Sequence, residues 1–479
     1  MTIPTYFNRM GITVGGVEPV LLDYFYVEAL EDGSTISCSN LQSSHNLSAS
    51  LDQKTWTPLT TSTVATGVEA GKKIYLAGNT DNLGGWMCVK PTSDKKFKIG
   101  GKLMSLYSKS FTPPSAFNIV DVIAMYNSNT NLVECSVDFD GPPDAVYCFQ
   151  NCTALTGLTE GFRFNDALAV NSMFNGCTSL KSIAAGFALP KCTENTQYMF
   201  GNCSSLVEIG SGFTAPSTKN VNYMFSGCVN LVDLPDGFEI PCAQYCASMF
   251  EECHSLTGVP ESLVPSNVFN CEKMFFNCSS LIDIGSEFTC PNVLGGGYMF
   301  NGCTSLSSLP SKFTCPSLTN GTNMFRGCTA LRELPDEFTV PSGCWGTSYM
   351  FYQCRSLTHL PSGFTKTTGT DKKYMFYQCY NLSGLPDGFN IETATDVQHM
   401  FYRCNSLTTF GDNVKIGGGA TDNTDLTKTN ITTIGDNFTW MPNVTYSGTW
   451  DPALGIKNVF PNATSVGSGW VVYNHHDGE

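Results

Sequence analysis

The sequence has little charge, and most of the charge it has is negative. Charged residues make up 14% of the 479 residues, and 26 Lys plus Arg stand against 41 Asp plus Glu, which gives a net charge of -15. Such a surface repels phosphate backbones and anionic lipid head groups. We therefore expect no nucleic-acid partner.

Long apolar runs are also missing. Nowhere do about 18 apolar residues follow one another, as a membrane-spanning helix would require. The first 19 residues, MTIPTYFNRMGITVGGVEP, lack a basic start followed by an apolar stretch. We therefore expect no membrane insertion and no export signal.

Catalytic and metal-binding motifs are absent as well. The six histidines are scattered, and neither HExxH, GxSxG nor CxxC occurs. Catalysis needs groups that converge in a pocket, whereas a repeat array offers one residue type per row. The sequence therefore predicts a protein that is not an enzyme, with no catalytic residues, no metal and no cofactor.

What the sequence has in abundance is a repeat of 25 or 26 residues. Eleven units share Phe at unit position 2, Cys at position 5 and Leu at position 8, and ten of them have Met at position 1. A weaker unit around Met125 precedes them and a decayed one at 429–438 follows, as terminal caps do in repeat arrays. The ladder cysteines at position 5 are Cys152, Cys177, Cys203, Cys228, Cys253, Cys278, Cys303, Cys328, Cys354, Cys379 and Cys404.

One such unit is too short to fold alone. Six buried side chains contribute about 12 kcal/mol, while ordering about 25 backbone residues costs roughly 1 kcal/mol or more for each. We therefore expect stacked coils in which like positions lie about 4.8 Å apart and the ladder cysteines are reduced core thiols. SLxxLP is expected to form the short strand of each coil, and MFxxC an irregular or short helical side.

The pattern MFxxCxSLxxLPxGF, over about residues 125 to 440, resembles the repeats of BspA-type leucine-rich-repeat surface proteins of bacteria and of phages of gut bacteria. The resemblance implies a curved right-handed solenoid used for adhesion or protein interaction without catalysis. The expected fold class is mainly β with irregular or short helical segments, an N-terminal β-sandwich followed by a leucine-rich-repeat solenoid of about 12 coils.

The domains follow from these patterns. Short alternating runs such as YFYVEAL and KKIYLAG predict the sandwich, and the repeat sets the limits of the solenoid. The expected parts are an N-terminal arm at 1–19, the β-sandwich at 20–97, a cap before the repeats at 98–124, the solenoid at 125–410, and a C-terminal cap and tail at 411–479.

Tyrosine occupies unit position 3 in the last three full units, directly after the buried Phe. Stacked at coil spacing, these tyrosines and their neighbours predict an aromatic and basic strip suited to a protein or glycan surface. The alternative is that the tyrosines only pack the outer wall or a neighbouring subunit. The candidate contact residues are Tyr352, Tyr377, Tyr402, Tyr380, Arg355 and Arg403.

Cysteines outside the ladder form two stacked pairs. Cys246 and Cys271 share position 23 of neighbouring units, and Cys290 and Cys315 share position 17. As surface pairs they could oxidise or hold a metal, but structural metal sites take four ligands in CxxC-like spacing. We expect no metal there, and the sequence leaves disulfides open.

Together these features predict a noncatalytic binding and display protein. The first interpretation is a bacteriophage virion surface component (fibre, appendage or decoration) that adheres to a host cell-surface protein or glycan, with residues 1–97 contacting other virion proteins. The alternatives are a bacterial cell-surface adhesin of the BspA type, on the cell surface or extracellular, and a purely structural capsid or tail decoration. Repeated weak contacts would supply avidity.

Overall fold

The computed structural model describes most of the repeats and the strands before them. The described residues are 23–39, 47–78, 89–106, 122–139, 144–193, 195–260, 263, 267–364, 369–417, 433–434, 439–440, 464–468 and 471–472. The predicted arm at 1–19 lies outside them, as does most of 411–479. The chain divides into two compact units, Met1–Ile240 and Pro241–Glu479, so the division falls inside the repeat array.

The first unit begins with two sheets of antiparallel strands. Alternation sets the buried face of each strand: Phe25, Val27 and Ala29 of β1 are fully buried, whereas Tyr26 and Glu28 between them are half-buried. One sheet contains β2, β5 and β7, and the other contains β1, β3, β4, β6 and β8. The bounds are β1 Phe25–Ala29, β2 Ser34–Ser39, β3 Leu47–Ser50, β4 Thr57–Pro58, β5 Thr63–Val68, β6 Lys73–Gly78, β7 Lys90–Ser93 and β8 Phe97–Lys102.

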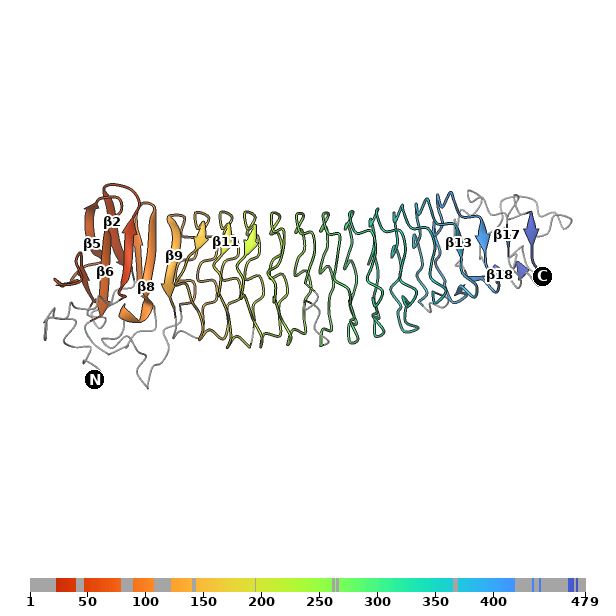
Figure 1. Ribbon diagram of the computed structural model, residues 1–479, viewed down its shortest axis with the longest axis horizontal. Coiled ribbons are helices and arrows are strands. Elements are labelled where there is room, and N and C mark those ends of the chain that lie inside the picture. Colours follow the sequence, from red (N-terminus) through yellow and green to blue (C-terminus); the bar gives the residue numbers. More distant parts are fainter. Residues whose placement is uncertain are drawn as a thin grey trace. The chain divides into compact units, whose positions relative to one another are not determined.

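Strand β8 connects these antiparallel strands to the first coils (Figure 1). It pairs antiparallel with β1 on one side and parallel with β9 (Leu132–Asp138) on the other. Parallel pairing continues through β10 (Gly157–Leu158), β11 (Ser182–Ile183) and β12 (Glu208–Ile209). One nine-stranded sheet therefore crosses residue 97, where the sequence analysis ends the sandwich, and η2 (Leu103–Leu106) follows β8.

Short parallel strands also mark the last described coils of the second unit (Figure 1). They form two four-stranded sheets, so each of these coils contributes one strand to each sheet. The first sheet contains β13 (Gly384–Leu385), β15 (Thr409–Phe410), β17 (Thr433–Ile434) and β19 (Ser465–Val466). The second contains β14 (Asn390–Ile391), β16 (Lys415–Ile416), β18 (Thr439–Trp440) and β20 (Val471–Val472).

The prediction of a strand at SLxxLP is wrong for several coils that have proline at position 12. No strand is formed at this place in the coils of Pro235, Pro310, Pro335 and Pro361. In some coils without this proline the N–H of position 12 donates to the preceding coil, as Gly210 N does to the Ile183 carbonyl at 2.9 Å and Gly411 N to the Leu385 carbonyl at 3.1 Å. Proline has no N–H to donate, so the coil loses this ladder hydrogen bond.

The MFxxC side of the coil is irregular rather than helical. Two residues of each described MFxxC segment adopt left-handed backbone angles, such as Tyr349 with φ 57° and Gln353 with φ 60°. Alternate N–H groups then point at the next coil: Tyr349 N donates to Lys373 O at 3.0 Å and Gln353 N to Tyr377 O at 2.8 Å. These bonds satisfy the backbone on this side without a regular strand.

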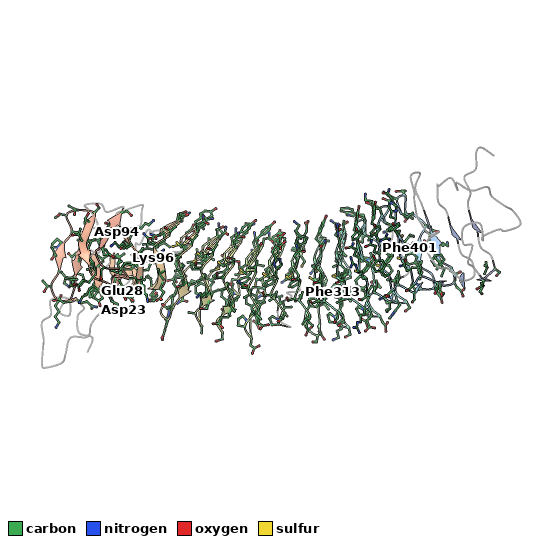
Figure 2. All side chains as sticks on the ribbon, turned by 90° about the horizontal axis from the view of Figure 1, so that it is seen from above. Asp23, Glu28, Asp94, Lys96, Phe313 and Phe401 are labelled. Atoms are coloured by element: carbon green, nitrogen blue, oxygen red, sulfur yellow. The ribbon has the colours of Figure 1, made fainter. Side chains whose placement is uncertain are left out.

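Within each of the two compact units of the chain, two columns of phenylalanine fill the interiors of the coils. Position 2 rings stack on one another, as Phe351 on Phe376 at 5.6 Å and 1° between ring planes. Position 15 rings form the second column, in which Phe288 stacks on Phe313 at 5.5 Å. Phe313 and Phe401, labelled in Figure 2, belong to the position 15 and position 2 columns. Such pairs add about 0.5–1.5 kcal/mol each to the gain from burial.

Candidate functional site

The ladder cysteines are structural. All eleven are buried, and the Cys177 thiol donates to the Phe149 carbonyl of the preceding coil at 3.0 Å. Burial raises the pKa of the Cys228 thiol to about 12, which leaves it protonated and unreactive at neutral pH. The same thiol-to-carbonyl bond, at 2.9–3.2 Å, recurs for Cys152, Cys203, Cys228, Cys278, Cys303, Cys328, Cys354, Cys379 and Cys404.

The three tyrosines at position 3 form a stacked column in the second unit. The ring centroids of Tyr352 and Tyr377 lie 4.8 Å apart with 2° between their planes, and those of Tyr377 and Tyr402 lie 5.0 Å apart with 13°. All three side chains are half-buried. The structure therefore brings the predicted tyrosines together, with their ring faces against one another.

A second aromatic column runs beside the first and was missed by the sequence analysis. Tyr349, Tyr374 and His399 occupy the position two residues before the buried Phe. Tyr349 stacks on Tyr374 at 4.8 Å, and Tyr374 lies 5.1 Å from His399. The columns touch, since Tyr374 is 5.5 Å from Tyr377. The signal was present in the sequence as YMFY at 349–352 and 374–377 and as HMFY at 399–402.

An arginine lies beside the first and the last tyrosine of the position 3 column. The guanidinium carbon of Arg326 lies 4.7 Å from the Tyr352 ring centroid, and that of Arg403 lies 5.4 Å from the Tyr402 centroid. The predicted residues Arg355 and Tyr380 form a further pair at 5.9 Å, and Tyr380 is also hydrogen-bonded to Arg403. We name the eight residues of the two columns and their ends the aromatic–arginine strip: Arg326, Tyr349, Tyr352, Tyr374, Tyr377, His399, Tyr402 and Arg403.

Two phenols of the strip, Tyr349 and Tyr377, have a raised pKa. Burial raises the pKa of Tyr349, and the neighbouring Tyr374 raises it further. Burial likewise raises the pKa of Tyr377, with added contributions from Tyr352 and Tyr402. A phenol that keeps its proton remains a hydrogen-bond donor as well as an acceptor.

The four paired cysteines outside the ladder are buried, so the surface pairs considered from the sequence are wrong. Cys246, Cys271 and Cys290 are at most 1% exposed and Cys315 is 6% exposed. Positions 23 and 17 face each other in the interior, where Cys290 is hydrogen-bonded to both Cys271 and Cys315. Among the described residues, no group of three or more His, Cys, Asp or Glu side chains could hold a metal ion.

A fully buried lysine lies at position 23 near the strip. Lys372 is 0% exposed, and its Nζ donates to Thr347 Oγ1, at the same position one coil earlier, at 2.7 Å. Burial lowers its pKa to about 8, although the nearby Cys344 and Asp371 act in the opposite direction. The side chain fills a site that Val397 occupies one coil later, so it belongs to the core and not to the strip.

The coils and their parallel pairing at steps of one repeat define a leucine-rich-repeat protein, as expected from the sequence, and the fold is mainly β. Residues 99–207 and 145–257 match the BspA type leucine rich repeat region (6 copies), which confirms the resemblance. These repeats are therefore of the BspA type. Residues 244–359 and 298–412 match a family described as Mycoplasma protein of unknown function, DUF285.

Solved structures of bacterial leucine-rich-repeat proteins are also similar to this chain. A leucine-rich repeat protein from Bacteroides ovatus is 16% identical with a TM-score of 0.38, and covers 72% of this chain and 79% of its own. A leucine rich cell surface protein from Faecalibacterium prausnitzii is 17% identical with a TM-score of 0.32, and covers 78% and 94%. No curated protein sequence matches this chain.

Within the described part of the chain, no helix combines the length and the apolar composition that crossing a membrane requires.

Proposed function

We propose that this protein is a noncatalytic binding protein that attaches to a cell-surface protein or glycan through the aromatic–arginine strip. The observation that carries the proposal is the pair of adjoining aromatic columns whose position 3 column ends in Arg326 and Arg403. Tyr and Arg are enriched among the residues that dominate binding energy at interfaces. Because stacking already orders these rings, a partner costs them little further side-chain entropy.

The repeat architecture supports binding rather than catalysis. BspA-type leucine-rich repeats place the same residue types in rows, and leucine-rich repeats generally serve protein binding. The reactive groups of the interior are protonated thiols bonded to backbone carbonyls, such as Cys354 on Phe325. The strip, by contrast, consists of side chains that reach the outside of the coils.

The setting we propose is the surface of a bacteriophage virion, with residues 1–97 toward other virion proteins. Support comes from the resemblance of MFxxCxSLxxLPxGF to repeats of gut-bacterial and phage proteins. A bacterial cell-surface adhesin is the second candidate, favoured by the BspA-type match. Capsid and tail genes beside this gene would support the virion, and secretion genes would support the adhesin.

The proposal is tested by adhesion of the purified protein to intact gut bacteria. The triple variant Y352A/Y377A/Y402A should lose binding, because it removes the position 3 column. Tyr245, which is 45% exposed and lies outside the strip, supplies the matched control Y245A, which should bind like the wild type. Unchanged binding of the triple variant would remove the strip as the contact surface.

A further inference from the structure

The arginines at the strip have no carboxylate partner of their own. In the described part of the chain, neither Arg326 nor Arg403 forms an ion pair, although the protein has 41 Asp plus Glu. Exposed lysines elsewhere do find acidic partners one coil away, as Lys312 does with Glu287. The two positive charges of the strip are thus not neutralised by a carboxylate, in a protein whose net charge is -15, although the Arg403 guanidinium is hydrogen-bonded to the phenols of Tyr380 and Tyr402.

The stacking of the rings determines which chemistry can approach. One face of Tyr352 lies against Tyr377 and the other against the Arg326 guanidinium. Tyr377 is enclosed by Tyr352 on one face and Tyr402 on the other. The Arg403 guanidinium lies 5.4 Å from the Tyr402 ring centroid and is hydrogen-bonded to the phenols of Tyr402 and Tyr380. At Tyr352 and Tyr377 a partner therefore meets ring edges and hydroxyls instead of ring faces. Aromatic edges carry partial positive charge, so edges, phenol donors and guanidinium groups all favour an anion. The stacking of a neutral sugar ring on Tyr352 and Tyr377 is blocked.

The length of the strip suits a short extended peptide. Arg326 and Arg403 lie three coil steps apart, which at about 4.8 Å per step is roughly 14 Å. An extended chain advances about 3.3 Å per residue, so roughly five residues span that distance. Carboxylates near the two ends of such a segment would each meet a guanidinium, which binds carboxylates through paired hydrogen bonds.

We propose that the strip binds an acidic segment of a partner protein, in extended conformation, whose Asp or Glu side chains pair with Arg326 and Arg403. This inference rests on the proposed function and names the partner's chemistry. A protein segment is favoured over an acidic polysaccharide because the covered ring faces offer no platform for sugar rings, whereas Tyr and Arg together are typical of protein interfaces.

The test uses a fluorescent peptide of ten glutamates and the full chain. Wild type should bind it, more weakly as salt rises, and should not bind a peptide of ten glutamines. The double variant R326Q/R403Q should bind at least about tenfold more weakly, because both ends lose their charge. The control R332Q removes an exposed arginine outside the strip and should bind like the wild type. Circular dichroism confirms that the variants are folded.

Three results would overturn the inference. Equal peptide binding by R326Q/R403Q and wild type would show that the strip is not the site. Binding of polygalacturonate but not of the glutamate peptide would assign an acidic glycan instead. If Y352A/Y377A/Y402A abolishes adhesion to bacteria while the glutamate peptide neither binds nor competes, the proposed function stands and the acidic partner does not.

Discussion

The thiol of Cys328 lies 3.1 Å from the carbonyl oxygen of Phe300, one coil earlier. That oxygen also accepts the backbone N–H of Cys303, likewise at 3.1 Å. A carbonyl oxygen has two lone pairs, so both bonds can form at once. Each ladder thiol with this bond therefore ties its coil to the coil before it, in addition to filling space in the core.

Removing one ladder thiol should destabilise the second unit modestly. C328A loses the bond to Phe300 and leaves a small cavity, but the Phe300 oxygen keeps its bond to Cys303. We expect a loss of about 1–2 kcal/mol in the free energy of unfolding, measured by urea denaturation. The control C242A changes an exposed cysteine outside the ladder and should stay within about 0.5 kcal/mol of wild type. Equal stability of C328A and wild type would contradict a structural role for the thiol.

Thiol reagents should distinguish the ladder from the surface. Burial raises the pKa of Cys228 and of Cys404 to about 12, so their reactive thiolate forms are scarce at pH 8 and shielded from reagent. With iodoacetamide at pH 8, mass spectrometry should find exposed Cys242 alkylated first, and ladder cysteines alkylated only after denaturation. Rapid alkylation of Cys228 in the folded protein would show that the thiols are not enclosed.

Replacing the buried lysine should stabilise the protein in a pH-dependent way. The pKa of Lys372 is lowered from 10.5 to about 8, so between these values the unfolded chain holds a proton that the folded chain lacks. The stability contributed by this residue therefore rises with pH across that window, and the full penalty is present below about pH 8. K372M removes the penalty, and we expect it to gain about 2–3 kcal/mol at pH 7.

The measurement for Lys372 is the difference in unfolding free energy between K372M and wild type at pH 7, 9 and 10.5. The difference in unfolding free energy should shrink as pH rises, because deprotonation of Lys372 removes from the wild type the penalty that K372M lacks at every pH. The control K219M replaces an exposed lysine and should show no such trend. A constant difference across the series would mean that folding does not alter the protonation of Lys372.

The sequence predicts those features that depend on the repeat itself. Cys at position 5 and Phe at position 2 recur in every full unit, so stacking alone places Cys379 against Phe351. The contact between Tyr352 and Tyr377 could be predicted in the same way, because equal positions in successive coils become neighbours. A mainly β leucine-rich-repeat fold follows from the same period.

The features that the sequence analysis missed depend on contacts between different positions. Arg326 occupies the same unit position as Tyr352, and its planar guanidinium stacks on that ring as another aromatic side chain would. The sequence analysis missed it because it considered only the tyrosines at this position. Cys271 and Cys290 meet across the coil interior, which spacing along the chain does not reveal. The coil of Pro310 forms no strand at this place, and the N–H that proline lacks removes one ladder hydrogen bond there, which the repeat pattern alone does not reveal.

The most direct test of the strip as the contact surface is tyrosine footprinting on the bound protein. Iodination of each tyrosine is followed by mass spectrometry for the protein free in solution and for the protein attached to intact bacteria. If the strip is the contact surface, Tyr352, Tyr377 and Tyr402 should become protected from iodination on binding. Tyr245, which is 45% exposed and lies outside the strip, should react equally in both states. Equal iodination of the three strip tyrosines in the free and attached protein would contradict it.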